Sequence, residues 1–183
     1  MDQIANVLIW VIIFQGIFLG FTYIFSEKSK SKANKILGFF LLAFVFEALS
    51  SEFFPYNYLG TYLIGDYFGL PEVKLFFPAL FLHYVLEKLD RVDAYRKYLS
   101  VNYLLATLVF CLTPLNIVFH LFGNMRIRDV FGVENTNLIF MTSQYLAFGL
   151  TVAAFIVSIV ETYRYKKMVQ NEYTDFGMLQ INW

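Results

Sequence analysis

The amino-acid sequence predicts an all-α fold, a polytopic transmembrane helical bundle of about five spans. First, hydrophobic residues make up 58% of the 183 residues and charged residues only 15%, whereas soluble domains average about 25% charged residues. Second, the apolar residues form long runs of membrane-crossing length. Third, the alternating pattern of membrane β-strands does not occur, and in lipid the remaining way to pair every backbone group is the helix.

The first span is expected at residues 4–25, a run of 22 residues without a charge. At 1.5 Å per residue this run is about 33 Å long, enough for a hydrocarbon core of roughly 30 Å. No basic region precedes it and no small-residue cleavage site follows it, so we interpret it as a retained span rather than a signal peptide.

Four further spans follow. The third of the five predicted spans is short, and the fourth and fifth are long. Pro78 and Pro114 lie in the third and fourth spans and are expected to kink them. The expected boundaries are residues 36–54, 73–87, 98–122 and 137–160.

The basic residues indicate how the spans are oriented. Five spans place alternate connectors on opposite sides, and 11 of the 14 Lys and Arg residues then fall on one side. Because cytoplasmic loops are enriched in Lys and Arg, this side is expected to be cytoplasmic and the N-terminus to lie outside. The residues on the basic side are Lys28, Lys30, Lys32, Lys35, Lys88, Arg91, Arg96, Lys97, Arg164, Lys166 and Lys167.

Two segments lie between or after the spans. Residues 55–72, rich in Tyr and Gly and bounded by prolines, suit an outer-leaflet loop, with a re-entrant or interfacial helix as an open alternative. Residues 163–183 are expected to form a cytoplasmic juxtamembrane helix or linker. Because the chain stops at Trp183 within an apolar pattern, we expect more protein to follow in the native gene product.

Ionisable groups within a membrane are costly, so each is a candidate functional residue. Glu47 lies within the second span, Asp66 in the outer connector and His83 within the third span. These three residues are candidates for a signal or ligand contact. The alternative for Glu47 is an interhelical hydrogen bond, and for His83 a packing role.

The remaining polar candidates suit contacts between helices. Gln15 precedes Gly16 and Gly20, whose four-residue spacing favours close helix packing. Interhelical hydrogen bonds are expected for Asn102, Asn116 and Gln144.

No constellation of catalytic residues is recognisable in the sequence. Cys/His metal spacing, a phosphate-binding glycine loop and a nucleophile elbow are all missing. We therefore expect no catalytic residue, no cofactor and no metal site. The net charge of zero argues against direct binding of nucleic acid by this chain.

Three stretches resemble one family. "FQGIFLGFTYIFSEKSKSKANKILGFFLL", "FFPALFLHYV" and "YTDFGMLQINW" are similar to the N-terminal multi-span membrane module of membrane-bound regulators of Bacteroidetes. The resemblance implies a multi-pass protein of the bacterial inner membrane joined to a cytoplasmic output domain. That domain is most often of the AraC helix-turn-helix type and sometimes a LytTR or histidine-kinase domain.

The first hypothesis is accordingly a membrane-embedded sensory module that passes a signal to an output domain absent from this chain. The expected partners are the lipid bilayer, a second copy or other membrane subunits, and an apolar or amphipathic ligand. The alternatives are a small structural subunit of a larger inner-membrane complex and the sensor region of a membrane histidine kinase. A transporter or channel fragment ranks lower, because no internal repeat is visible.

Overall fold

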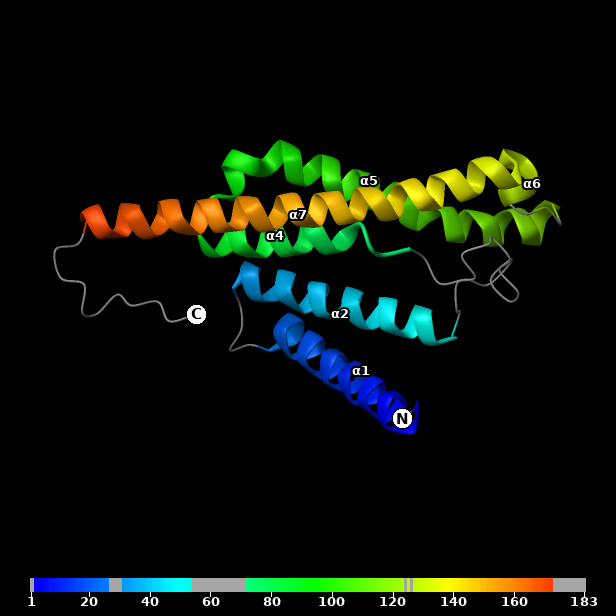
Figure 1. The fold of residues 1–183 in the computed structure, drawn as a ribbon, viewed down its shortest axis with the longest axis horizontal. Helices are drawn as coiled ribbons and strands as arrows, with labels where there is room; N and C mark the ends of the chain where they lie inside the picture. Colours follow the sequence, from blue (N-terminus) through cyan, green and yellow to red (C-terminus); the bar gives the residue numbers. More distant parts are fainter. Residues whose placement is uncertain (1, 27–30, 54–71, 124, 126, 173–183) are drawn as a thin grey trace.

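The computed structural model describes residues 2–26, 31–53, 72–123, 125 and 127–172, which are mostly helical (Figure 1). This result confirms the predicted all-α class. Asp66, most of the 55–72 connector and the 173–183 tail lie outside the described residues, so the predictions for them stay untested. The helices are α1 (Asp2–Phe25), α2 (Lys32–Phe53), α4 (Phe76–Lys88), α5 (Val92–Gly123), α6 (Ile127–Phe131) and α7 (Val133–Glu172).

Three of these helices are long and apolar enough to cross a membrane, over Val7–Phe25, Val92–Gly123 and Val133–Gln170. They coincide with the first, fourth and fifth predicted spans. Helices α2 and α4 coincide with the second and third. The 13 residues of α4 make a helix of about 20 Å, shorter than a hydrocarbon core of roughly 30 Å. The confirmed part of the five-span prediction is therefore three membrane-length helices in an all-α fold.

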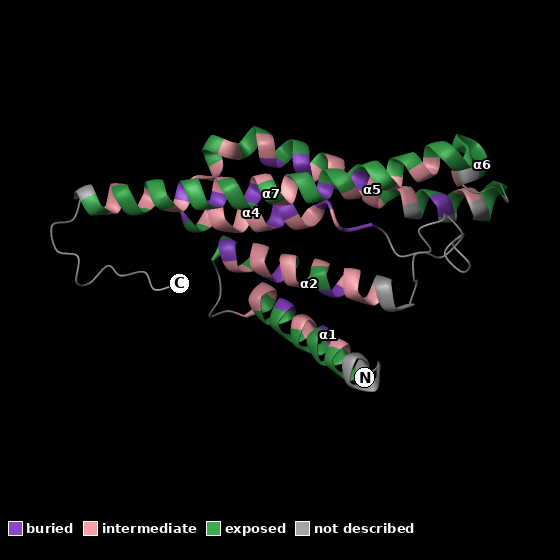
Figure 2. Cartoon of the chain, in the orientation of Figure 1, coloured by how far each residue is buried: buried purple, intermediate pink, exposed green. Residues whose placement is uncertain are grey.

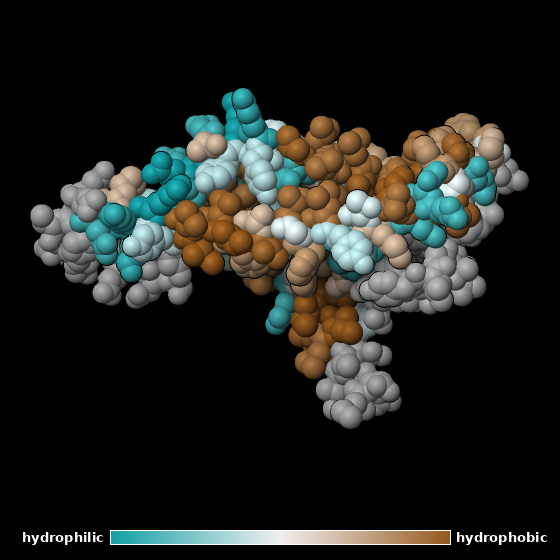
Figure 3. Space-filling view, turned by 45° about the horizontal axis from the view of Figure 1, so that its top comes forward, coloured by the Kyte–Doolittle hydropathy of each residue, from teal (hydrophilic) through white to brown (hydrophobic). Residues whose placement is uncertain are grey.

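The outside of the long helices is apolar. Phe18, Phe122 and Phe148 are 71%, 87% and 73% exposed, and hydrophobic side chains dominate the middle of the molecule while hydrophilic ones gather toward its ends (Figure 3). Exposed apolar patches of this extent are rare on soluble monomers. Contact with hydrocarbon is the environment that suits such a surface.

Helices α1 and α2 form a closely packed hairpin with glycines at the contact. A Cβ atom added to Gly38 would lie 2.8 Å from the carbonyl oxygen of Gly20, and one added to Gly20 would lie 2.8 Å from Leu42. A Cβ on Gly16 would collide with the Val45 side chain. The close-packing face predicted for Gly16 and Gly20 is thus confirmed, with α2 as its partner.

The short helix α4 lies at the centre and packs against α2, α5 and α7 (Figures 1 and 2). Its Leu82 and Leu86 are fully buried, and its Phe81 ring lies 4.7 Å from the Phe155 ring of α7 between centroids. The expected kink at Pro78 is wrong. Pro78 is the third residue of α4, where a helix leaves backbone N–H groups without intrahelical partners, so proline costs no hydrogen bond there.

Basic residues gather at one end of the molecule. Helix α2 begins, α4 ends and α7 ends toward the same end of the molecule (Figure 1). The predicted alternation of connectors is followed by these helices, and the end that they share is rich in basic residues. The described residues of this basic end are Lys32, Lys35, Lys88, Arg91, Arg96, Lys97, Arg164, Lys166 and Lys167.

Candidate functional site

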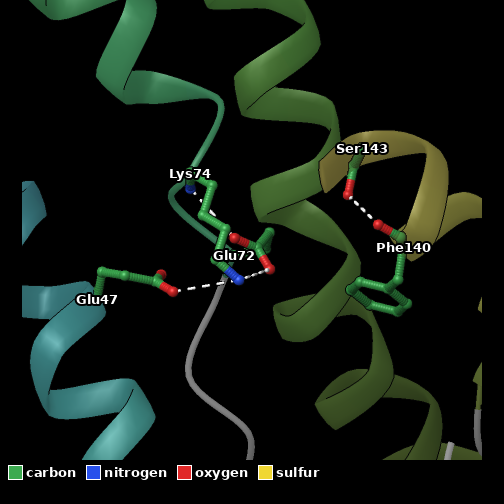
Figure 4. Close-up of polar contacts among 5 residues, drawn as sticks. All are labelled: Glu47, Glu72, Lys74, Phe140 and Ser143. Atoms are coloured by element: carbon green, nitrogen blue, oxygen red, sulfur yellow. Dashed lines mark hydrogen bonds and ion pairs between the residues drawn. The ribbon is translucent and has the colours of Figure 1, made fainter. Parts of the chain in front are cut away.

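Two carboxylates share one ammonium group where α2 meets the residues that lead into α4 (Figure 4). Glu47 of α2 lies 3.2 Å from Lys74 Nζ through its Oε1 atom. Glu72 Oε2 lies 3.6 Å from the same nitrogen. The backbone N–H of Lys74 also donates a hydrogen bond of 3.1 Å to Glu72 Oε1. We call Glu47, Glu72 and Lys74 the charged triad; it joins α2 to the connector that leads into α4.

The triad has one more carboxylate than it has ammonium groups. Glu72 is only 2% exposed, and within the described part of the chain the Oε2 atoms of Glu47 and Glu72 are buried without a hydrogen bond. Burial raises the pKa of Glu72 above its ordinary value of 4.5; the Lys74 ammonium opposes this rise, and the Glu47 carboxylate adds to it. Because desolvation disfavours the charged form, burial favours the protonated form of Glu72 compared with a carboxyl group in solvent.

The nearest polar group of α7 shown beside the triad does not join it. The Ser143 hydroxyl donates a 2.7 Å hydrogen bond to the Phe140 carbonyl within its own helix (Figure 4). A bond of this kind to the preceding turn satisfies a buried hydroxyl locally. The ion pairs of the triad come from α2 and the residues just before α4.

A second polar contact lies deeper in the bundle and joins α4 to α5. His83 Nδ1 and the Tyr103 hydroxyl are 3.0 Å apart, and the two rings meet edge to face with centroids 5.8 Å apart. His83 is half-buried. This contact agrees with the packing role considered for His83, because the Tyr103 hydroxyl pairs with its ring nitrogen.

A third polar cluster ties α5 to α7 at the basic end. The Tyr95 hydroxyl donates to Glu161 Oε1 at 2.9 Å, and Arg164 Nη1 donates to the same oxygen at 2.7 Å. Glu161 is 4% exposed. A buried carboxylate paired with a cation and a hydroxyl meets the condition under which burying a charge is tolerated. We call Tyr95, Glu161 and Arg164 the basic-end cluster.

The predicted site residues do not form one site. Glu47 belongs to the charged triad and His83 pairs with Tyr103. Gln15 is exposed on α1, and Gln144 is half-buried on α7. Asp66 lies outside the described residues.

Among the residues expected to form interhelical hydrogen bonds, Asn116 has a defined partner. Its Oδ1 atom accepts a 2.7 Å hydrogen bond from the N–H of Ile127 at the start of α6. Glu72, Tyr95, Tyr103 and Glu161 are functional candidates that the sequence reasoning missed. The signal available for Glu72 was its position two residues from Lys74 before an apolar run. Glu161 ends such a run one helical turn before Arg164.

Among the described residues, no group of three or more His, Cys, Asp or Glu side chains is placed to hold a metal ion. Chemically, the charged triad can take up or release a proton and thereby change the pairing of Lys74. Comparisons with known proteins found no match to a protein family, to a curated protein or to a solved structure. The fold alone gives the class of the chain: an all-α protein whose described residues include three helices able to cross a membrane.

Proposed function

We propose that this chain is a membrane-embedded sensory module of a bacterial transcription regulator, which passes a signal to a cytoplasmic output domain. In this proposal the chain crosses the inner membrane five times with its N-terminus outside. The basic end faces the cytoplasm, in agreement with the positive-inside rule. The charged triad then lies toward the outer face, where a signal would arrive.

One observation carries the proposal: a single helix connects the region of the triad with the basic end. Leu75, the neighbour of Lys74, packs in one buried cluster with Ala147 of α7. Glu161 of the basic-end cluster lies 14 residues further along the same helix, about 21 Å at 1.5 Å per residue. An unbroken helix transmits a shift or rotation along its axis, and α7 continues past Glu161 toward the tail.

The signal must distinguish two packings of the bundle, because a ligand shifts an equilibrium only by its differential affinity for the two states. The triad offers such a difference. With Glu72 ionised, two carboxylates compete for Lys74. With Glu72 protonated, Glu47 is the one charged carboxylate of the triad. We propose an apolar or amphipathic ligand, or a change in protonation, as the event that selects between these states.

A reporter fusion tests the function. A DNA-binding domain that represses only as a defined dimer is joined after Trp183 of the complete chain, and transcription is measured in bacteria. We expect Glu47→Gln and Lys74→Met to change the output at equal membrane levels. Lys166→Met, a change of an exposed cation on α7, is the matched control and should leave it unchanged. Identical output from all four proteins would refute a sensory role.

The second candidate is a structural subunit of a larger membrane complex. It is favoured by the amount of large apolar surface, which suits partner helices as well as lipid. Constant co-purification with one partner at fixed stoichiometry, together with an unresponsive reporter, would support this reading. A histidine-kinase sensor would use the same geometry, and the gene sequence after Trp183 distinguishes it from a transcription regulator.

A further inference from the structure

Three buried polar atoms on α5 and α7 have no hydrogen-bond partner among the residues that the structure describes. They are the hydroxyl oxygen of Tyr98, Nδ2 of Asn102 and Oγ of Ser158. Asn102 and Ser158 are 3% and 7% exposed. Such groups are nearly always paired in native proteins, with protein atoms or with ordered water.

The helix register places these atoms near one another. The bond between Tyr95 and Glu161 fixes the pairing of α5 with the antiparallel α7. Three residues further along α5 and three residues back along α7, Tyr98 comes level with Ser158. At this level α4 holds the two helices together, because Leu99 of α5 and Ala154 of α7 belong to one cluster with Leu82 and Leu86 of α4.

The next turn of α5 carries the third of these polar atoms, Asn102 Nδ2. Asn102 follows Tyr98 by four residues, so the two side chains lie on the same face of α5. Tyr95, Tyr98 and Tyr103 all pack against the cluster of Leu82, Leu86, Leu99 and Ala154. One donor that lacks an acceptor, Asn102 Nδ2, thus lies one turn from two hydroxyl groups that can both donate and accept.

The polar side chains of α5 and α7 continue from this level toward solvent at the basic end. The last of them are Tyr95 and Glu161, and the Arg164 side chain that binds Glu161 is 65% exposed. The approach of α5 to α7 here is made by long side chains such as Tyr95. The polar side chains of these two helices therefore extend toward the charged surface.

We propose that the α5–α7 seam formed by Tyr98, Asn102 and Ser158 is a binding site for ordered water, entered from the basic end past the basic-end cluster. A water molecule there accepts from Asn102 Nδ2 and donates to a hydroxyl oxygen, which satisfies groups that are costly to leave unpaired in lipid. The proposal concerns the packing of α5 on α7. It does not depend on the sensory function and would hold for a structural subunit too.

Cysteine accessibility tests the seam in membranes that contain the full chain. Cys111, the single cysteine, is exposed and is first changed to serine. Ser158→Cys is then compared with Ile159→Cys, on the exposed neighbour (68%), and with Ala106→Cys, at a fully buried apolar position. The probe is a charged, membrane-impermeant methanethiosulfonate, which reacts with the thiolate form that water stabilises.

We expect Ser158→Cys to react about tenfold faster than both controls, since thiolate reactivity follows hydration and access. The reaction should occur when the reagent is added to the side that carries the basic loops. Equal rates at all three positions would show a dry interface and overturn the proposal.

Thermal unfolding gives an independent readout that does not need a cysteine. If water joins Tyr98 and Ser158, then Tyr98→Phe and Ser158→Ala should each lower the unfolding midpoint, and the double variant should lose less than the sum. If the hydroxyls are instead unpaired in a dry interface, removing either one should raise the midpoint. A rise would overturn the proposal even where labelling is ambiguous.

Discussion

The contact between Gly20 and Gly38 makes a quantitative prediction for the α1–α2 hairpin. In Gly38→Ala the new Cβ would lie 2.6 Å from Ile24 Cγ1, 2.8 Å from the carbonyl oxygen of Gly20 and 3.2 Å from Tyr23 Cβ. The Ile24 atom belongs to a side chain that can rotate, whereas the carbonyl oxygen is backbone and moves only if the two helices separate. The methyl group therefore forces α1 away from α2.

The magnitude follows from comparison with a second glycine. Gly149, in α7, has nothing within 4 Å of a built Cβ, so Gly149→Ala changes only the helix propensity, a gain of about 0.5–1 kcal/mol. Gly38→Ala receives the same gain but also the overpacking penalty of about 1–3 kcal/mol. The free energies of unfolding of the two variants should thus differ by about 1–3 kcal/mol, with Gly149→Ala the more stable.

Thermal unfolding of both variants in the same detergent measures this difference. For a chain of this size 1 kcal/mol corresponds to about 2–4 °C in the midpoint. Cross-linking between cysteines introduced into α1 and α2 adds a local readout, which should weaken in Gly38→Ala alone. Equal midpoints, or a stabilised Gly38→Ala, would refute the close backbone approach.

Three further predictions concern the polar groups. Lys74→Met leaves Glu47 and Glu72 facing each other without a cation and should lower the free energy of unfolding by about 2–4 kcal/mol. This loss is no larger than the usual cost of breaking a buried ion pair, because the Lys74 side chain is 29% exposed. Adding Glu72→Gln should restore part of that loss, and no recovery would contradict the pairing. Because the folded-state pKa of Glu72 lies above 4.5, its contribution to stability is full below that pH and is lost as pH rises through the folded pKa. Glu72→Gln should flatten this part of the midpoint-versus-pH curve, and an unchanged curve would exclude Glu72 as its source. Tyr103→Phe removes the hydroxyl that pairs with His83 and should cost about 0.5–1.5 kcal/mol in thermal unfolding, whereas Tyr163→Phe, at an exposed position of α7, should cost nothing measurable.

The features that a sequence encodes locally were predictable here. Uninterrupted apolar runs identified the three membrane-length helices, and the spacing of Gly16 and Gly20 identified the close-packing face of α1. The glycine of α2 that completes this contact, Gly38, was not singled out, because one glycine in a helix carries no signal without its partner. Pro78 was misjudged for a related reason: whether proline kinks or begins a helix depends on a boundary that the apolar run does not define.

The polar site was less predictable, because its members come together through tertiary packing. Glu47 was recognised from the cost of a carboxylate in an apolar run. Its partner Lys74 lies 27 positions away, at the start of the predicted third span, and nothing local in the sequence indicates that the two side chains meet. Tyr103 and Tyr95 are two of 13 tyrosines, and composition does not reveal which of them are buried. Their hydrogen bonds depend on the packing of α5 against α4 and α7.

These contacts divide the described bundle into two parts that differ in how firmly they are held. Helices α1 and α2 meet through glycine and backbone, a contact that tolerates little adjustment. Helices α4, α5 and α7 are joined by directional hydrogen bonds at His83 and Glu161.

Between the two parts lie the rings of Phe40 and Phe44 against Phe77, with centroids 6.1 and 5.6 Å apart, and the ion pair of Glu47 with Lys74. Apolar ring contacts are non-directional compared with hydrogen bonds, so the ion pair is the specific constraint on how the hairpin sits against α4. A perturbation of the triad should therefore move the hairpin against α4 and, through the contact of Leu75 with α7, shift α7 as well. A change in hairpin position together with a displacement of α7 at Glu161 is consequently the structural signature to seek in the Lys74→Met variant.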